Sequence, residues 1–186
     1  MKKLILASAS PRRRQILSDG GFSFDVLTSD REEHISAKTS PEKFAVRNAL
    51  IKAEDVYQKT DGTPVVLGAD TVVQIDGVIL EKPKDEADAE RMLRFLSGRT
   101  HEVITGYAII TKGMHESGYA VSKVTFNELS EEQISNYVKS GLCMDKAGAY
   151  GIQDGYGLIK CFDGDYDNVV GLPLEQIKST IEEFLK

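Results

Sequence analysis

The stretch VVLGADTVVQIDGVIL, residues 65–80, decides the fold more than any other part of the sequence. Its apolar and β-branched runs predict two buried strands, 65–67 and 71–75, separated by a Gly-Ala-Asp triplet. The Asp-Gly pair at residues 76–77 then predicts a tight hairpin into a third strand. We therefore expect a sheet that contains antiparallel strands at this point.

Helices and further strands alternate on both sides of this stretch. Ser-Pro at residues 10–11 and again at 40–41 predicts two helix N-termini. Ser130 begins a Ser-Glu-Glu-Gln capping box that predicts another helix. Residues 102–111 and 119–126 have the composition of a strand pair joined by a Gly-containing turn. Helices between strands, together with hairpins, predict an α/β fold with a mixed twisted sheet and flanking helices.

Length and composition limit the classes of protein that remain. The 186 residues predict a single domain over residues 1–186. The 23 Lys and Arg against 29 Asp and Glu give a net charge of −6, which argues against stable nucleic-acid binding but not against a small anionic ligand. Two cysteines, Cys143 and Cys161, are too few for a disulfide framework and indicate a reducing compartment, the cytoplasm. The sequence holds no apolar segment of about 20 residues, so we expect no membrane span.

The segment SASPRRR, residues 8–14, is the first candidate for chemistry. It lies at a predicted junction between strand and helix, where unpaired N–H groups and the helix dipole favour an anion. Ser8 and Ser10 add hydroxyl donors, and the guanidinium groups of Arg12 and Arg13 suit phosphate oxygens. The alternative is a well-capped helix with a solvated basic face, and the sequence leaves both interpretations open.

Lys52 stands where an apolar side chain is expected. On the helix that begins at residue 40 it shares a stripe with Ala45, Ala49 and Val56. A lysine in such a stripe either extends to solvent or meets an anion.

Asp70 interrupts the apolar run with a carboxylate. A buried carboxylate needs a partner, and Lys82 follows just across the hairpin. The alternative is a turn aspartate that caps its own backbone. A second carboxylate for a magnesium ion could come from Glu33 or Glu32, whose alternative is a solvated loop.

The segment DKAGAYGIQ, residues 145–153, combines small residues with an amide. Small residues would let the backbone approach a ligand, and Gln153 offers both a donor and an acceptor to a base edge. The alternative is an ordinary tight loop with a surface glutamine. His34, His101 and His115 show no metal-ligand spacing and are interpreted as structural or surface residues.

The segments SASPRRRQIL, VLGADTVV, LEKP, LSGRTHEVITG, DKAGAYGIQ and VVGLPL together resemble the Maf family of nucleoside triphosphate pyrophosphatases. The resemblance covers nearly the whole chain. It implies two lobes around a nucleotide-binding cleft, a cytoplasmic location, a divalent cation and a homodimer. It also implies a link to septum formation and cell division.

The resemblance also assigns roles to individual residues. Asp70 corresponds to the catalytic acid–base and metal-associated residue, and Glu33 to its partner on the metal side. Thr71 and Gln153, with one of the arginines of SPRR, correspond to positions that tune base choice. The phosphate-handling set comprises Ser8, Arg12, Arg13, Lys52 and Lys82.

The combination of SPRR, GADT and YGIQ resembles the branch of the family that hydrolyses dTTP and UTP. The expected activity is that of a hydrolase acting on acid anhydrides, in which water attacks the α-phosphorus and pyrophosphate leaves. Asp70 would activate or orient the water directly or through Mg²⁺, Mn²⁺ or Co²⁺. Cations would stabilise the charge on the triphosphate. Two alternatives stay open: the same reaction on 7-methyl-GTP or another modified nucleotide, and a non-enzymatic nucleotide-binding regulator of cell division.

Overall fold

The computed structural model describes residues 2–31 and 39–186. The strands are β1 (Leu4–Leu6), β2 (Phe24–Val26), β3 (Val65–Ile75), β4 (Val78–Leu80), β5 (Thr100–Thr111), β6 (Met114–Phe126) and β7 (Ile159–Asp163). The helices are α1 (Pro11–Asp19), α2 (Pro41–Gln58), α3 (Glu86–Leu96), α4 (Glu131–Lys139), the 3₁₀ turn η1 (Ala147–Ala149), α5 (Tyr166–Val170) and α6 (Leu174–Phe184).

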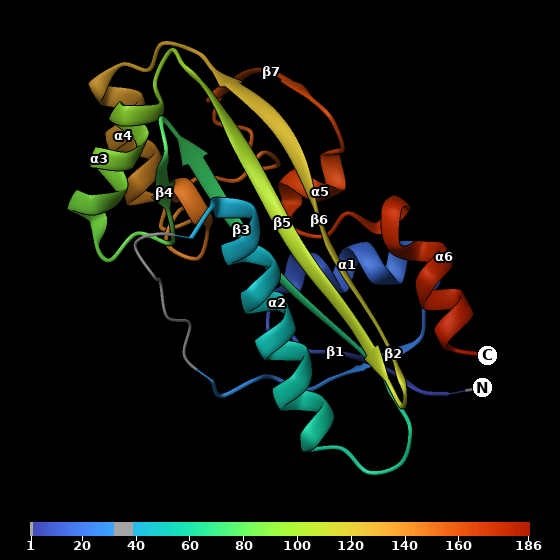
Figure 1. Cartoon of the computed structure of the whole chain (residues 1–186). Helices are drawn as coiled ribbons and strands as arrows, with labels where there is room; N and C mark the ends of the chain where they lie inside the picture. The colour runs from blue at the N-terminus through green and yellow to red at the C-terminus, as the bar shows by residue number, and fades with distance from the viewer. Residues whose placement is uncertain (1, 32–38) are drawn as a thin grey trace. The chain divides into compact units, whose positions relative to one another are not determined.

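These strands of the described residues form one seven-stranded sheet in the order β2-β1-β3-β5-β6-β7, with β4 paired to β3 (Figure 1). Strand β1 is parallel to β2 and β3, whereas β4 and β7 are antiparallel to their neighbours. The predicted α/β fold with a mixed sheet and flanking helices is therefore confirmed.

The chain divides into two compact units. Unit 1 comprises Met1–Asp70, Thr105–Ala120 and Gly171–Lys186, and unit 2 comprises Thr71–Ile104 and Val121–Val170. Each unit has an apolar cluster of its own, the one in unit 1 lying between α2 and the strands β1, β3 and β5, and the one in unit 2 joining α3 and α4 to β4 and the second half of β3. That residues 1–186 act as one domain stays a prediction.

In unit 1, helix α2 rests directly on the backbone of the sheet (Figure 1). A Cβ atom on Gly68 of β3 would lie 2.3 Å from the carbonyl oxygen of Ala49, and one on Gly106 of β5 would lie 2.4 Å from that of Ala45. Two glycines on adjacent strands thus remove the side-chain layer that normally separates a helix from a sheet. Polar residues on this face of α2 can therefore reach β3.

Local signals in the sequence account for the starts of α1 and α2 and for the turn between β3 and β4. Ser10 and Ser40 cap α1 and α2 by accepting hydrogen bonds from backbone N–H groups of the first turn, with proline in the next position. Asp76 and Gly77 have φ of 53° and 76°, and positive values at both positions are those of the tight hairpin turn that Asp-Gly predicts.

The break predicted at the Gly-Ala-Asp triplet is wrong. Strand β3 continues without interruption from Val65 to Ile75, so Asp70 is a strand residue and does not cap a turn of its own. The triplet stays extended because Gly68 and Ala69 are buried in the sheet. The strand positions of the glycine and the aspartate reflect packing and a charged partner, which the sequence pattern does not reveal.

Two smaller observations bear on the expected environment. Cys143 is buried and Cys161 exposed, and both are free thiols. Among the described helices, none combines the length and the apolar character that crossing a membrane requires.

Candidate functional site

Asp70 is held by two side chains of α2. Lys52 Nζ donates to Asp70 Oδ1 at 2.7 Å, and Asn48 Nδ2 donates to Asp70 Oδ2 at 3.1 Å. The side chains of Lys52 and Asp70 are 18% and 10% exposed. Lys52 therefore meets an anion instead of extending to solvent, which settles the alternative that its place in the apolar stripe left open.

Asn48 is the member of this cluster that the sequence analysis missed. It is 1% exposed and lies one helical turn before Lys52, so its side-chain amide and the Lys52 ammonium group point to the same side of α2. The sequence did show that Asn48 is a polar residue four positions before Lys52, which was already placed on the buried stripe. That spacing does not identify the partner of Asn48, because the contact between α2 and β3 at Gly68 is not evident from the sequence.

The cluster presents a carboxylate in one fixed orientation. A buried ion pair is stable only when its remaining polar atoms also find partners, and among the described residues Lys52 and Asn48 each donate to a different oxygen of Asp70. A carboxylate can accept about four hydrogen bonds in all. Asp70 therefore has the capacity to receive a water proton or a cation while Lys52 and Asn48 keep the group in place.

The second polar cluster of unit 1 surrounds the start of α1. Ser8 Oγ accepts a hydrogen bond from the backbone N–H of Ser10 at 3.3 Å and another from Arg13 Nη1 at 3.0 Å. Arg13 Nε donates to the carbonyl oxygen of Gly171 at 2.8 Å. The predicted helix cap is confirmed, and Arg13 is oriented by the protein itself. The phosphate-binding role of Ser8, Ser10, Arg12 and Arg13 stays a prediction.

The register of the parallel strands relates the two clusters. Leu6 of β1 pairs with Leu67 of β3, and the N–H of Ala7 donates to the carbonyl oxygen of Leu67 at 2.8 Å. The chain then leaves β1 toward α1, while β3 continues to Asp70. The start of α1 and Asp70 therefore both follow the segment in which β1 and β3 pair in parallel, on the carboxyl side where α/β proteins commonly bind ligands.

Unit 2 carries the other predicted site residues. Thr71 is half-buried in β3, Lys82 is exposed after β4, and Gln153 is exposed in the segment after η1. Gly148 nearby has φ of 68°, and a Cβ atom on it would lie 3.0 Å from the side chain of Val73. The absence of a side chain at Gly148 therefore allows this segment to pack against β3. The close approach of a ligand to residues 145–153 stays a prediction.

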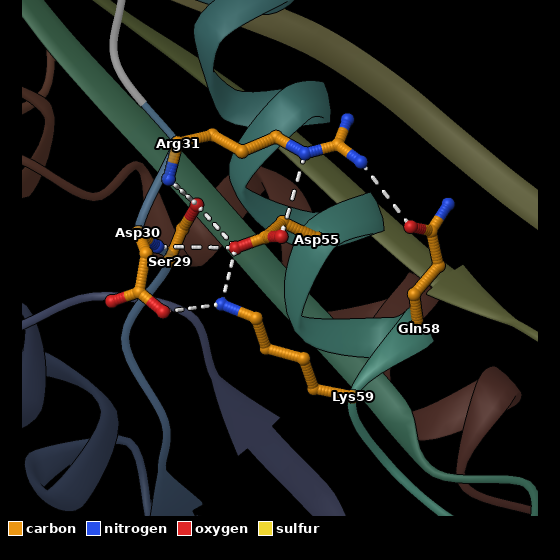
Figure 2. Close-up of polar contacts among 6 residues, drawn as sticks. All are labelled: Ser29, Asp30, Arg31, Asp55, Gln58 and Lys59. Carbon is orange, nitrogen blue, oxygen red and sulfur yellow. Dashed lines mark hydrogen bonds and ion pairs between the residues drawn. The ribbon is translucent and has the colours of Figure 1, made fainter.

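Glu33 and Glu32 lie outside the described residues, but the chain just before them is fixed by Asp55 of α2 (Figure 2). Asp55 Oδ2 accepts from Ser29 Oγ at 2.8 Å, from the backbone N–H of Asp30 at 3.1 Å and from Lys59 Nζ at 2.8 Å. Arg31 Nε lies 3.4 Å from Asp55 Oδ1.

These contacts shift the pKa values of both Asp55 and Lys59. The hydrogen bond from Lys59, followed by that from Ser29, lowers the pKa of Asp55 to about 2. The carboxylates of Asp30 and Asp55 raise the pKa of Lys59. The strong preference of Asp55 for its charged form means that this anchor persists at any pH near neutrality.

A divalent cation fits the chemistry of one described residue. Asp70 supplies the carboxylate oxygens that Mg²⁺ prefers, and Mg²⁺ typically takes only one or two protein carboxylates together with phosphate oxygens of the substrate. Within residues 2–31 and 39–186, no three His, Cys, Asp or Glu side chains gather in a group able to hold a metal ion.

Comparison with known proteins agrees with this architecture. The chain is 53% identical over 175 residues to a dTTP/UTP pyrophosphatase of Thermococcus gammatolerans, covering 94% of this chain and 92% of that protein. It is 45% identical over 185 residues to a dTTP/UTP pyrophosphatase of Bacillus cereus, covering 99% and 96%. A HAM1 protein from Coxiella burnetii superposes with a TM-score of 0.59 at 16% identity over 98% of this chain and 100% of that one, which concerns the fold alone. The sequence model of the Maf-like proteins matches residues 3–184, and the chain belongs to this family.

Proposed function

We propose that this chain is a nucleoside triphosphate pyrophosphatase that hydrolyses dTTP and UTP to the nucleoside monophosphate and pyrophosphate. The observation that carries the proposal is the identity of 45–53% with relatives named dTTP/UTP pyrophosphatase over at least 92% of their length. The buried carboxylate of Asp70 between Lys52 and Asn48 supplies a group suited to the chemistry.

The reaction is a substitution at phosphorus. A water oxygen forms a bond to the α-phosphorus, and the bond from that phosphorus to the bridging oxygen breaks. The electron pair leaves with pyrophosphate, and the water proton passes to Asp70 Oδ1 or Oδ2. Lys52 and Asn48 keep the carboxylate oriented, because a general base must lie within hydrogen-bond reach of the proton that it takes.

Cations must attract the substrate, since the chain itself is acidic with a net charge of −6. The proposed phosphate ligands are the start of α1 with Ser8, Ser10, Arg12 and Arg13, together with Lys52 and Lys82. Arginine forks suit phosphate oxygens, and N–H groups at a helix start add donors for an anion.

The proposed metal ligands are Asp70 and Glu33. A bound divalent cation supplies charge neutralisation on the triphosphate. Thr71 and Gln153 are the proposed contacts to the base. A homodimer, a cytoplasmic location and a link to septum formation are further predictions from the family resemblance.

The decisive experiment incubates the purified protein with Mg²⁺ and dTTP, UTP, CTP, GTP, 7-methyl-GTP or ITP, and separates the products by chromatography. Monophosphate and pyrophosphate from dTTP and UTP are expected. In water labelled with heavy oxygen, the label should enter the monophosphate, because the attack is at the α-phosphorus. Cleavage confined to 7-methyl-GTP would refute the base preference. No cleavage with Mg²⁺, Mn²⁺ or Co²⁺ would favour a nucleotide-binding regulator.

The role of Asp70 has a matched control in the same unit. Asp25 forms an ion pair with Lys3 at the surface, where the two side chains are 55% and 66% exposed. Asp70→Asn should lower kcat on dTTP by about a hundredfold or more, as loss of a general base does. Asp25→Asn should leave kcat unchanged. Near-normal turnover by a folded Asp70→Asn variant would show that the role assigned to Asp70 is wrong.

A further inference from the structure

The turn Gly151–Asp154 is closed by a side chain of another element. Its own backbone makes one bond, from the N–H of Asp154 to the carbonyl oxygen of Gly151 at 3.2 Å. The hydroxyl of Tyr137 in α4 makes two more: it donates to Asp154 Oδ2 at 2.6 Å and accepts from the N–H of Gly151 at 3.0 Å. Gln153, which lies inside this turn, is exposed.

The cluster that closes the turn is buried, and its lysine, Lys146, also lies 3.0 Å from Asp145 Oδ1 at the surface. Tyr137 is completely buried. Lys146 Nζ lies 3.6 Å from Asp154 Oδ2, and these two side chains are 9% and 8% exposed. Burial, followed by the hydrogen bond to Asp154, raises the pKa of the Tyr137 hydroxyl. The hydroxyl therefore keeps its proton and donates it to the carboxylate.

Gly151 is required by this cluster. A Cβ atom on Gly151 would lie 2.6 Å from Asp154 Oδ2 and 2.7 Å from Lys146 Cε. The carboxylate and the lysine stem thus occupy the space that any larger residue would need. The residue before the turn is also fixed, because the buried Tyr150 hydroxyl lies 2.7 Å from His101 Nε2. The backbone on both sides of Gln153 is thus held by buried groups, while its side chain stays exposed.

We propose that Tyr137, Asp154 and Lys146, called here the turn clamp, position Gln153 and thereby set the base preference of the enzyme without contacting the nucleotide. This inference rests on the proposed function, in which Gln153 contacts the base. Hydrogen bonds to a base edge weaken steeply as the donor–acceptor line bends. A turn that loses its clamp presents the amide in several orientations, so the distinction between bases weakens while the chemistry at Asp70 continues.

The test compares UTP with CTP, which share a sugar and differ at the base edge that an amide can read. Tyr137→Phe removes only the hydroxyl. The ratio of kcat/KM for UTP to that for CTP should fall about five- to tenfold, the value of one hydrogen bond. The loss should lie mainly in KM for UTP. The ratio does not depend on the fraction of enzyme that is folded, so a loss of stability alone leaves it unchanged.

Two further sets of variants separate the clamp from general packing. The ring centroids of Tyr156 and Tyr137 lie 4.9 Å apart, and the Tyr156 side chain is exposed. Tyr156→Phe is therefore a matched control that should leave the ratio of kcat/KM for UTP to that for CTP unchanged. Asp154→Asn retains an oxygen acceptor for Tyr137, whereas Asp154→Ala does not. Asp154→Asn should therefore keep more of the base preference than Asp154→Ala. Equal ratios in these two variants would overturn the proposal.

The final measurement combines Tyr137→Phe with Gln153→Ala. If the clamp acts through Gln153, adding Tyr137→Phe to Gln153→Ala changes the ratio no further. An additive effect, or an unchanged ratio in Tyr137→Phe when Gln153→Ala lowers it, overturns the clamp and leaves the proposed function standing. If Gln153→Ala leaves the ratio unchanged, both the proposed contact of Gln153 with the base and the proposed role of the turn clamp are refuted. Absence of turnover in the wild type refutes the proposed function itself.

Discussion

We expect this protein to lose stability between pH 7 and pH 5, and replacing His101 should remove most of that loss. His101 in β5 is 2% exposed, and its ring packs edge-on against Phe126 and Tyr150. Its Nδ1 atom has no hydrogen-bond partner in the described part of the chain. Burial lowers the pKa of His101 from 6.5 to about 4, so the folded protein holds the neutral imidazole.

The sign and size follow from proton linkage. As the pH falls below 6.5, the unfolded chain takes up a proton that the folded protein refuses until about pH 4, so stability declines through this window. The two pKa values make the loss about 2 kcal/mol between pH 7 and pH 5, and about 3 kcal/mol once both states are protonated. Asp55 contributes at lower pH, because its pKa is lowered from 3.8 to about 2 and its stabilisation is lost only as the pH falls through that range.

The assay is urea unfolding of the wild type and of His101→Gln at pH 7 and pH 5. The variant should be less stable at pH 7, because a buried hydrogen bond and ring contacts are lost, yet its free energy of unfolding should fall by about 2 kcal/mol less on acidification. His115→Gln at an exposed position is the control and should follow the wild type. The same fall in wild type and His101→Gln would refute the reasoning.

Three further predictions concern unit 1. Gly68→Ala should lower the free energy of unfolding by about 1–3 kcal/mol, since its methyl group meets the Ala49 carbonyl; an unchanged urea midpoint would mean that α2 can shift at no cost. Lys52→Met should lower the free energy of unfolding by about 3 kcal/mol, because it leaves the buried carboxylate of Asp70 without its cationic partner. The same substitution should cost less stability in an Asp70→Asn background, and equal losses in both backgrounds would show that the two residues are not coupled. Asp55→Asn should speed tryptic cleavage after Arg31, because the anchor of that segment weakens, while Asp25→Asn should not; equal rates would argue against the anchor.

The elements that depend on local chemistry were predictable from the sequence. Ser-Pro pairs, the Ser130 capping box and the Asp76-Gly77 hairpin all form as predicted, because each is decided by a few neighbouring residues. Strands β5 and β6 are longer than the predicted 102–111 and 119–126. Residues 114–118 lack an apolar face and are mostly exposed, so hydrophobic alternation gives no sign of a strand there.

The polar partners were less predictable, because they depend on contacts between distant segments. The stripe on α2 showed that Lys52 was out of place, but only the packing of α2 on Gly68 identifies Asp70 as its partner. Asn48 and Tyr137 were missed for the same reason, since an asparagine or tyrosine within a helix gives no local signal of the residue that it will bond. Asp154 had no interpretation in the sequence and acquires one from the Tyr137 hydroxyl.

The close packing of α2 on Gly68 and Gly106 limits the substitutions that this protein can accept. In most helix–sheet contacts, a layer of side chains can repack and absorb a substitution of one or two methyl groups. Here the helix backbone touches the strand backbone, so no such adjustable layer exists. A variant in which α2 is replaced by that of a homologue should therefore fold only when positions 45 and 49 carry small residues and positions 68 and 106 carry glycine. Sequence divergence in this protein will concentrate on the opposite face of the helix.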